Sequence, residues 1–165
     1  MLETYLAYGQ WANRLMFEGL ARVPQAVLVA PQKVVFGSIL QTAHHALAMS
    51  EVWRAHLTSG AHPYTSRNPE PCPSLAEIAA RQGEIDFWYR AYALALDWDS
   101  LRESVPFTFI DGGDGTMRRD QILLHVVNHA TYHRGHIVAM LNASGYSLPS
   151  TDLPVFLSVT DREND

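Results

Sequence analysis

Four long segments of this chain place apolar residues at helical spacing, and this pattern constrains the fold more than any other feature. In the first segment, residues 2–23, such side chains recur at three- and four-residue steps, at Tyr5, Tyr8, Ala12 and Leu15. Residues at these steps share one face of a helix, and that face has to be buried against another element. The chain has 165 residues, enough for one core. We therefore expect a single all-α domain, a helical bundle, over residues 1–165.

Local signals mark the second and third helices. Ser38 suits the N-cap of a helix that runs to residue 59. Ser74, with a glutamate three residues later, resembles the capping box of a helix that runs to residue 96. Prolines at 63, 69, 71 and 73 separate the two. Because proline breaks helices and central strands, this stretch is expected to be a loop.

A short β-hairpin is expected between the third and fourth helices. Residues 105–110 are rich in β-formers, and an Asp-Gly-Gly-Asp-Gly turn leads to a partner strand over residues 116–118. The fourth helix is predicted from Asp120 to Ser144, followed by Gly145 at the C′ position. The remaining tail is expected to pack back on the bundle through Leu153, Val155, Phe156 and Leu157.

Charge and composition exclude several classes of protein. The net charge is -5 and no basic stretch occurs, so a nucleic-acid partner is not expected. No apolar run approaches the roughly twenty residues that span a bilayer, and the N-terminus lacks the pattern of a signal peptide. Cys72 is the only cysteine, so no internal disulfide can form. These features predict a cytoplasmic protein without a membrane partner.

The fourth segment carries four histidines, His125, His129, His133 and His136. On an ideal helix, His133 falls inside the apolar stripe and His129 on its edge, while the outer two flank it. A histidine that faces a core needs a partner for its ring nitrogens. A single inward-facing histidine usually finds that partner in a hydrogen bond within the core. Two inward-facing histidines four residues apart can instead bind one metal ion, provided that a third ligand comes from another segment.

The second helix offers His44 and His45 as that third ligand. Adjacent helical residues point about 100° apart, so at most one of them can face the site. Periodicity does not decide between them, and His62 in the loop is less favoured.

Several motifs resemble the DinB/YfiT-like family. Residues 38–45, Ser-Ile-Leu-Gln-Thr-Ala-His-His, followed by Trp53, are similar to the family's second-helix signature. Residues 125–135, His-Val-Val-Asn-His-Ala-Thr-Tyr-His-Arg-Gly, are similar to its fourth-helix signature. The opening Trp-Ala-Asn at residues 11–13 and the tail over residues 145–153 also resemble it. The likeness covers nearly the whole chain.

The resemblance implies a four-helix bundle of up-down-down-up type, often a homodimer, with a three-histidine metal site at one end. By matching positions, the ligands would be His45, His129 and His133. One departure is visible: many relatives carry an acidic residue five places after the second-helix histidine, where this chain has Ser50, with Glu51 next to it.

Three neutral imidazoles would leave coordination positions of a divalent ion open, as in catalytic sites. Zinc suits this ligand set best, and nickel, iron and manganese are compatible. The resemblance implies a metal-dependent thiol S-transferase that acts on a small molecule, with a low-molecular-weight thiol as a co-substrate. Weaker candidates for orienting the electrophile are Tyr132, Asn128, Arg134 and His125. Each of these residues also has a simpler, non-catalytic interpretation. Tyr132 and Asn128 would pack or form hydrogen bonds within the bundle, and Arg134 would lie on a solvated helix face.

Two alternatives stay open at this point. A metal-dependent hydrolase needs a general base, for which Glu51 is a weak candidate. A non-catalytic, stress-linked protein would use the metal only for stability, with a fourth ligand from the protein. A pocket that reaches the metal would favour an enzyme, and a sealed site would favour the structural role.

Overall fold

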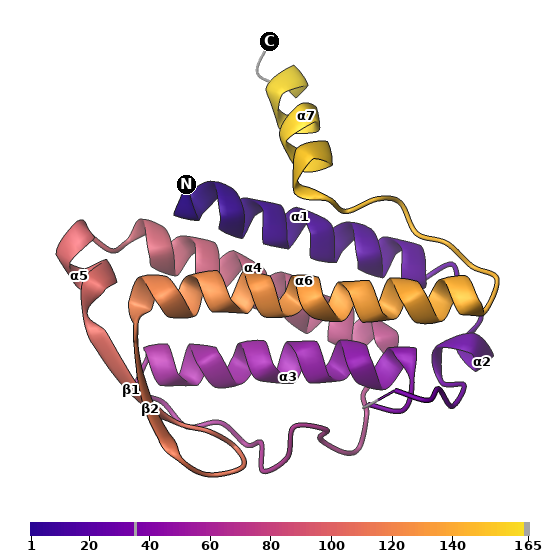
Figure 1. Ribbon diagram of the computed structural model, residues 1–165, viewed down its shortest axis with the longest axis horizontal. Helices are drawn as coiled ribbons and strands as arrows, with labels where there is room; N and C mark the ends of the chain where they lie inside the picture. The colour runs from indigo at the N-terminus through magenta and orange to yellow at the C-terminus, as the bar shows by residue number, and fades with distance from the viewer. Residues whose placement is uncertain (35, 164–165) are drawn as a thin grey trace.

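The computed structural model describes residues 1–34 and 36–163 and contains four long helices that form a bundle. They are α1 (Leu2–Leu20), α3 (Ile39–Leu57), α4 (Leu75–Leu94) and α6 (Arg119–Ala143). Helices α1 and α3 each pack against both α4 and α6. Figure 1 shows α1 and α6 running in one direction and α3 and α4 in the other. This arrangement confirms the up-down-down-up bundle.

Shorter elements connect the long helices or, in the case of α7, follow the last of them. They are α2 (Gln25–Leu28), α5 (Trp98–Arg102), β1 (Ser104–Thr108), β2 (Asp114–Arg118) and α7 (Leu153–Glu163). Strands β1 and β2 pair antiparallel from Ser104 opposite Arg118 to Thr108 opposite Asp114, which confirms the predicted hairpin. Helices α2, α5 and α7 were not predicted, because α2 and α5 are too short for a periodic pattern. The crossover loop, residues 58–74, joins the parallel helices α3 and α4 along the outside of the bundle.

The predicted caps begin the helices that position the site. The Ser38 hydroxyl accepts a hydrogen bond from the Gln41 amide at 3.1 Å. Ser74 and Glu77 form the expected capping box, in which the Ser74 amide donates to the Glu77 carboxylate at 2.9 Å. Each such cap stabilises its helix by roughly 1 kcal/mol, because it satisfies an amide that has no partner within the helix. The helices end slightly earlier than predicted.

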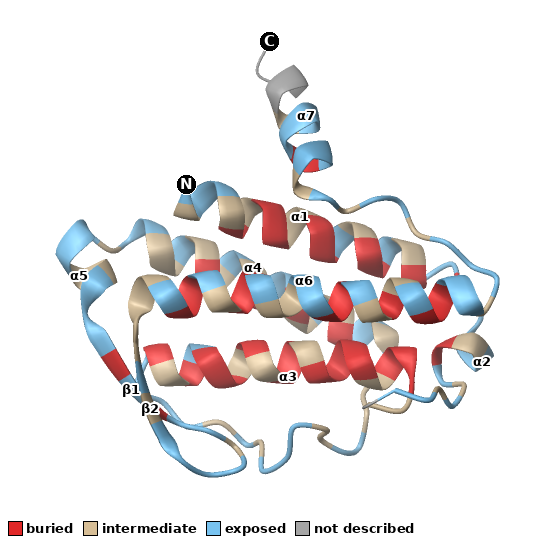
Figure 2. Ribbon diagram, viewed as in Figure 1, coloured by how far each residue is buried: buried red, intermediate tan, exposed pale blue. Residues whose placement is uncertain are grey.

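The core lies between the four long helices. Figure 2 shows the buried residues gathered on these helices, while the hairpin, α5 and the crossover loop are mostly half-buried or exposed. The largest side chains with almost no exposure include Leu20, Leu47, Ile85, Ile122 and Ile137, drawn from all four helices. The apolar stripes seen in the sequence therefore meet in one core. Within residues 1–34 and 36–163, none of the helices combines the length and the hydropathy that a membrane span requires.

The C-terminal tail differs from its prediction. It forms helix α7, which leaves the bundle at an angle and contacts α1. Phe156 is buried, with its ring 6.0 Å from that of Tyr8 and 5.5 Å from that of Trp11. Val155 and Leu157 are 37% and 39% exposed, so the expectation that they pack on the bundle is wrong. Only one face of α7 meets α1, and these two side chains lie outside it.

Candidate metal centre

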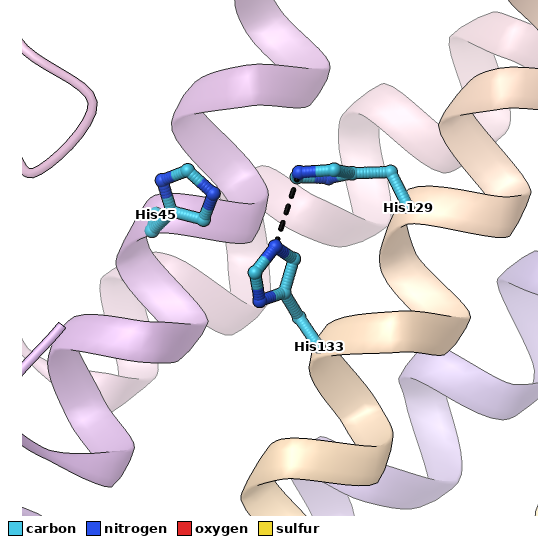
Figure 3. Close-up of side chains that lie close together, drawn as sticks. All are labelled: His45, His129 and His133. Atoms are coloured by element: carbon cyan, nitrogen blue, oxygen red, sulfur yellow. Dashed lines mark hydrogen bonds between the residues drawn. The ribbon is translucent and has the colours of Figure 1, made fainter. Parts of the chain in front are cut away.

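Three histidines from two helices converge between α3 and α6 (Figure 3). The ring centroids of His129 and His133 lie 4.4 Å apart, and that of His45 lies 5.3 Å and 4.6 Å from them. One ligand nitrogen from each ring lies within 4.8 Å of the other two. His129 and His133 are one turn apart near the middle of α6, rather than at an end of the bundle as expected.

The backbone of the crossover loop fixes the orientation of His45. Its Nδ1 lies 2.5 Å from the carbonyl oxygen of Arg67. Since a carbonyl only accepts, Nδ1 carries the proton and donates it, which leaves the lone pair of Nε2 free. Figure 3 shows one ring nitrogen of His45 directed toward the other two histidines. Metal-ligating histidines are commonly held in this way by a backbone carbonyl.

The two α6 histidines are suited to hold one ion. Their Nε2 atoms lie 3.1 Å apart. Two imidazole nitrogens bound at about 2.0–2.1 Å to one ion lie roughly 2.8–3.4 Å apart, for angles between a right angle and the tetrahedral value. The buried Nδ1 of His133 has no hydrogen-bond partner among the described residues. The donor set and its spacing therefore fit a divalent metal.

All three imidazoles are held in the neutral form that ligates metals. Burial, followed by the charges of His133, His45 and His125, lowers the pKa of His129 to about 3. Burial, followed by the charges of His45 and His136, lowers the pKa of His133 to about 4. The pKa of His45 is also lowered, mainly by burial and further by the charge of Arg67, against the opposing effect of the Arg67 carbonyl. Lone pairs are thus available well below neutral pH.

An open cavity of about 380 Å³ reaches the three histidines. Its walls are largely apolar and aromatic, and Phe36 stacks on the ring of His45 with centroids 3.8 Å apart. The hairpin contributes the wall over residues 107–110. Among the described residues, the cluster contains no fourth His, Cys, Asp or Glu. A ligand could therefore approach the ion from the cavity.

Comparison with known proteins places this architecture in a family. The model of the DinB family matches residues 1–165. The chain belongs to the DinB family. The protein DinB of Bacillus subtilis (strain 168) is 29% identical over 167 residues, covering 94% of this chain and 93% of that protein.

Two solved structures share the fold of this chain. A DinB-like protein from Bacillus cereus superposes with a TM-score of 0.67 at 17% identity, covering 88% of this chain and 94% of that one. YfiT from Bacillus subtilis, described as a probable metal-dependent hydrolase with an unusual four-helix bundle topology, has a TM-score of 0.72 at 14% identity. That match covers 88% of this chain and 89% of YfiT.

Of the four weaker site candidates, two line the cavity and two do not. Tyr132 and His125 line the cavity; Tyr132 is 62% exposed, and His125 packs on Trp53 with centroids 4.9 Å apart. Asn128 is exposed and is not among the lining residues, so its expected alternative of packing within the bundle is wrong.

Arg134 differs from both of its expected roles. It is buried on the side of α6 that faces α1, and it donates to the side chains of Asn13 at 2.8 Å and Tyr8 at 3.2 Å. Arg134 is not among the residues that line the cavity. Arg134 therefore links α6 to α1, and the prediction that it lies on a solvated helix face is wrong.

His44 and Glu51 also lie away from the cavity. His44 is buried beside the proline-rich loop, so the packing of α3 assigns the inward position to His45. The Glu51 carboxylate accepts from the guanidinium of Arg81 at 2.6 Å and from the hydroxyl of Tyr64. Since Glu51 is held by these partners and does not line the cavity, it does not serve as the general base beside the histidines.

Sequence reasoning missed several lining residues. They are Phe36, Arg67 and the hairpin residues Phe107 to Ile110. All of them come from connections between helices, where no periodic pattern reveals which side faces the site. The contact of Arg67 with His45 uses a backbone carbonyl and leaves no trace in the residue type.

Proposed function

We propose that this DinB-family protein binds one divalent metal ion through His45, His129 and His133 and acts as a metal-dependent enzyme of the thiol S-transferase type. The observation that carries this proposal is the convergence of three neutral imidazoles on one open cavity. Zinc is the first choice of metal for such a set, with nickel, iron and manganese as alternatives.

The cavity favours a catalytic over a structural metal. A structural zinc site is closed by four protein ligands, whereas a catalytic site has three and keeps a position open. When bound, the ion would supply a Lewis acid that lowers the pKa of a thiol or water reaching it. The largely apolar walls lower the local polarity beside the histidines, and electrostatic interactions are stronger in such surroundings than in bulk water.

The lining residues favour thiol transfer over hydrolysis. A thiolate is itself the nucleophile, so it needs no general base during attack. In the transfer, the sulfur forms a bond to carbon of the electrophile, and the leaving group departs with the electron pair of the broken bond. The thiol proton passes to a neutral imidazole or to solvent. Tyr132 and His125 are placed to orient the electrophile, because both line the cavity.

Hydrolysis is the second candidate. The description of YfiT as a probable metal-dependent hydrolase favours it, as does the imidazole of His125, whose centroid lies 5.6 Å from that of His129. A neutral imidazole can accept a proton from an attacking water. No aspartate or glutamate among the described residues lines the cavity, so a carboxylate base is lacking.

Metal analysis of protein purified without an affinity tag tests the first part of the proposal. We expect one equivalent of a divalent metal per chain, and metal-free protein that takes up none on addition of zinc or nickel would refute it. The metal-loaded protein should then be assayed with glutathione, bacillithiol and mycothiol against simple electrophiles, and with a panel of esters and amides. Turnover of the second panel alone would replace the transferase with a hydrolase.

The homodimer and the cytoplasmic location stay predictions. Light scattering of the purified protein measures the first, and fractionation of cells measures the second.

A further inference from the structure

Arg67 connects the histidine cluster to the hairpin at the rim of the cavity. Its carbonyl oxygen accepts the hydrogen bond from His45, so its backbone lies beside the cluster. Its guanidinium Nη2 reaches the carboxylate of Asp111 at 2.6 Å. Asp111 directly follows Phe109 and Ile110, two residues of the cavity wall. The positive charge of Arg67 therefore lies where the crossover loop and the hairpin meet above the cavity.

This charge has no equivalent elsewhere in the cavity wall. Among the described lining residues, Arg67 is the only arginine or lysine, and no aspartate or glutamate occurs. The three clustered histidines are neutral, and the other walls are mainly aromatic and aliphatic. The chain as a whole has a net charge of -5. An exposed cation at the rim of an apolar cavity, in a protein with a net negative charge, offers an attractive position for an anion.

The ion pair of Arg67 with Asp111 is easily exchanged. The two side chains are 56% and 58% exposed. Such pairs contribute little to stability, because water solvates both charges and holding two long side chains costs entropy. An incoming carboxylate can take the place of Asp111, and the planar guanidinium binds carboxylates through two parallel hydrogen bonds.

We propose that Arg67 selects a substrate that carries a carboxylate at one end and an apolar body at the other. The carboxylate would pair with the guanidinium at the rim, and the body would lie against Phe36, Trp53 and Phe107 inside the cavity. This inference rests on the proposed function only in assuming that the cavity receives a small molecule. It adds the chemical class of that molecule and the residue that recognises it.

A pair of probes that differ only in charge tests this assignment. 3-Phenylpropanoate and its neutral amide, 3-phenylpropanamide, should be titrated into the full-length, metal-loaded protein by ligand-observed NMR. We expect the acid to bind about tenfold more tightly than the amide, the typical gain from a charge-assisted pair. Arg67→Gln should remove this preference, and Asp111→Asn should increase affinity for the acid several-fold, because it removes the competing carboxylate.

Arg14→Gln is the matched control, since Arg14 also forms an exposed ion pair, with Glu18 on α1, and neither residue lines the cavity. It should leave both affinities unchanged. Equal binding of acid and amide to the wild type would overturn the proposal. Retention of the preference in Arg67→Gln would also overturn it, because the anion would then bind elsewhere, for instance at the metal.

Metal content separates this inference from the proposed function. Arg67→Gln keeps the carbonyl that orients His45, so its metal content should equal that of the wild type. Protein that holds metal but shows no preference for the acid refutes the role of Arg67 alone. Protein that cannot hold metal, yet loses a preference for the acid on Arg67→Gln, refutes the proposed function and leaves the anion site standing. If Arg67→Gln disturbs the loop and loses metal, the Asp111→Asn variant tests the proposal instead. It should bind the acid more tightly than the wild type does, and an unchanged affinity would count against the proposal.

Discussion

Acidification should weaken metal binding far less than three ordinary histidines would allow. A histidine with the usual pKa of about 6.5 is protonated roughly ten to one at pH 5.5, and each proton competes with the metal. Three such ligands would together lose about a thousandfold in affinity between pH 7.5 and pH 5.5. In this protein the pKa of His129 is about 3 and that of His133 about 4, so neither is protonated at pH 5.5.

Only His45 could then contribute to the loss. Its pKa is lowered as well, so the expected total is at most about tenfold, the loss that one ordinary histidine would give. The assay is a direct titration with Co²⁺ at the two pH values, followed by the visible absorption of the bound ion. A synthetic peptide of residues 119–143, in which burial is absent, should lose about a hundredfold over the same interval through its two clustered histidines.

A thousandfold loss in the intact protein would refute the reasoning. It would mean that the three imidazoles are solvated when the metal is absent, and that the packing of α3 against α6 does not hold them neutral. A loss within tenfold, beside a hundredfold loss in the peptide, would attribute the difference to burial.

Three further outcomes are expected. His129→Ala should lose bound metal, measured by elemental analysis, while the far-UV circular dichroism stays that of the wild type; unchanged metal content would contradict the ligand assignment. Arg134→Leu should lower the free energy of unfolding by roughly 2–4 kcal/mol in urea titrations, because it leaves the buried side-chain oxygen of Asn13 without its donor. The metal-free protein should lose stability as the pH falls from about 6.5, where the unfolded histidines begin to bind protons, toward about 4, the pKa of folded His133. For His133 this loss is about 3 kcal/mol at pH 4, and an unfolding free energy that stays constant over that interval would contradict it.

Local physical chemistry explains why much of the bundle is predictable from the sequence. Helical periodicity depends on neighbouring residues within one segment, so the four helices, the Ser38 and Ser74 caps and the hairpin were placed close to where the structure has them. The pair His129 and His133 was recognisable for the same reason, since their four-residue step puts them on one face of a single helix.

The tertiary structure decided what depends on contacts between segments. Rotation of α3 about its own axis is set by packing against α6, and this packing, rather than periodicity, turns His45 inward and His44 away. The inward face of α6 also leaves Arg134 directed at α1. The crossover loop and the hairpin have no repeating pattern, so only the folded chain brings the carbonyl and guanidinium of Arg67 beside the histidines. The sequence alone determined the helices and the chemistry available on each face, because both are local. The cavity and its rim arise only when the helices pack, because each is shared by segments far apart in the chain.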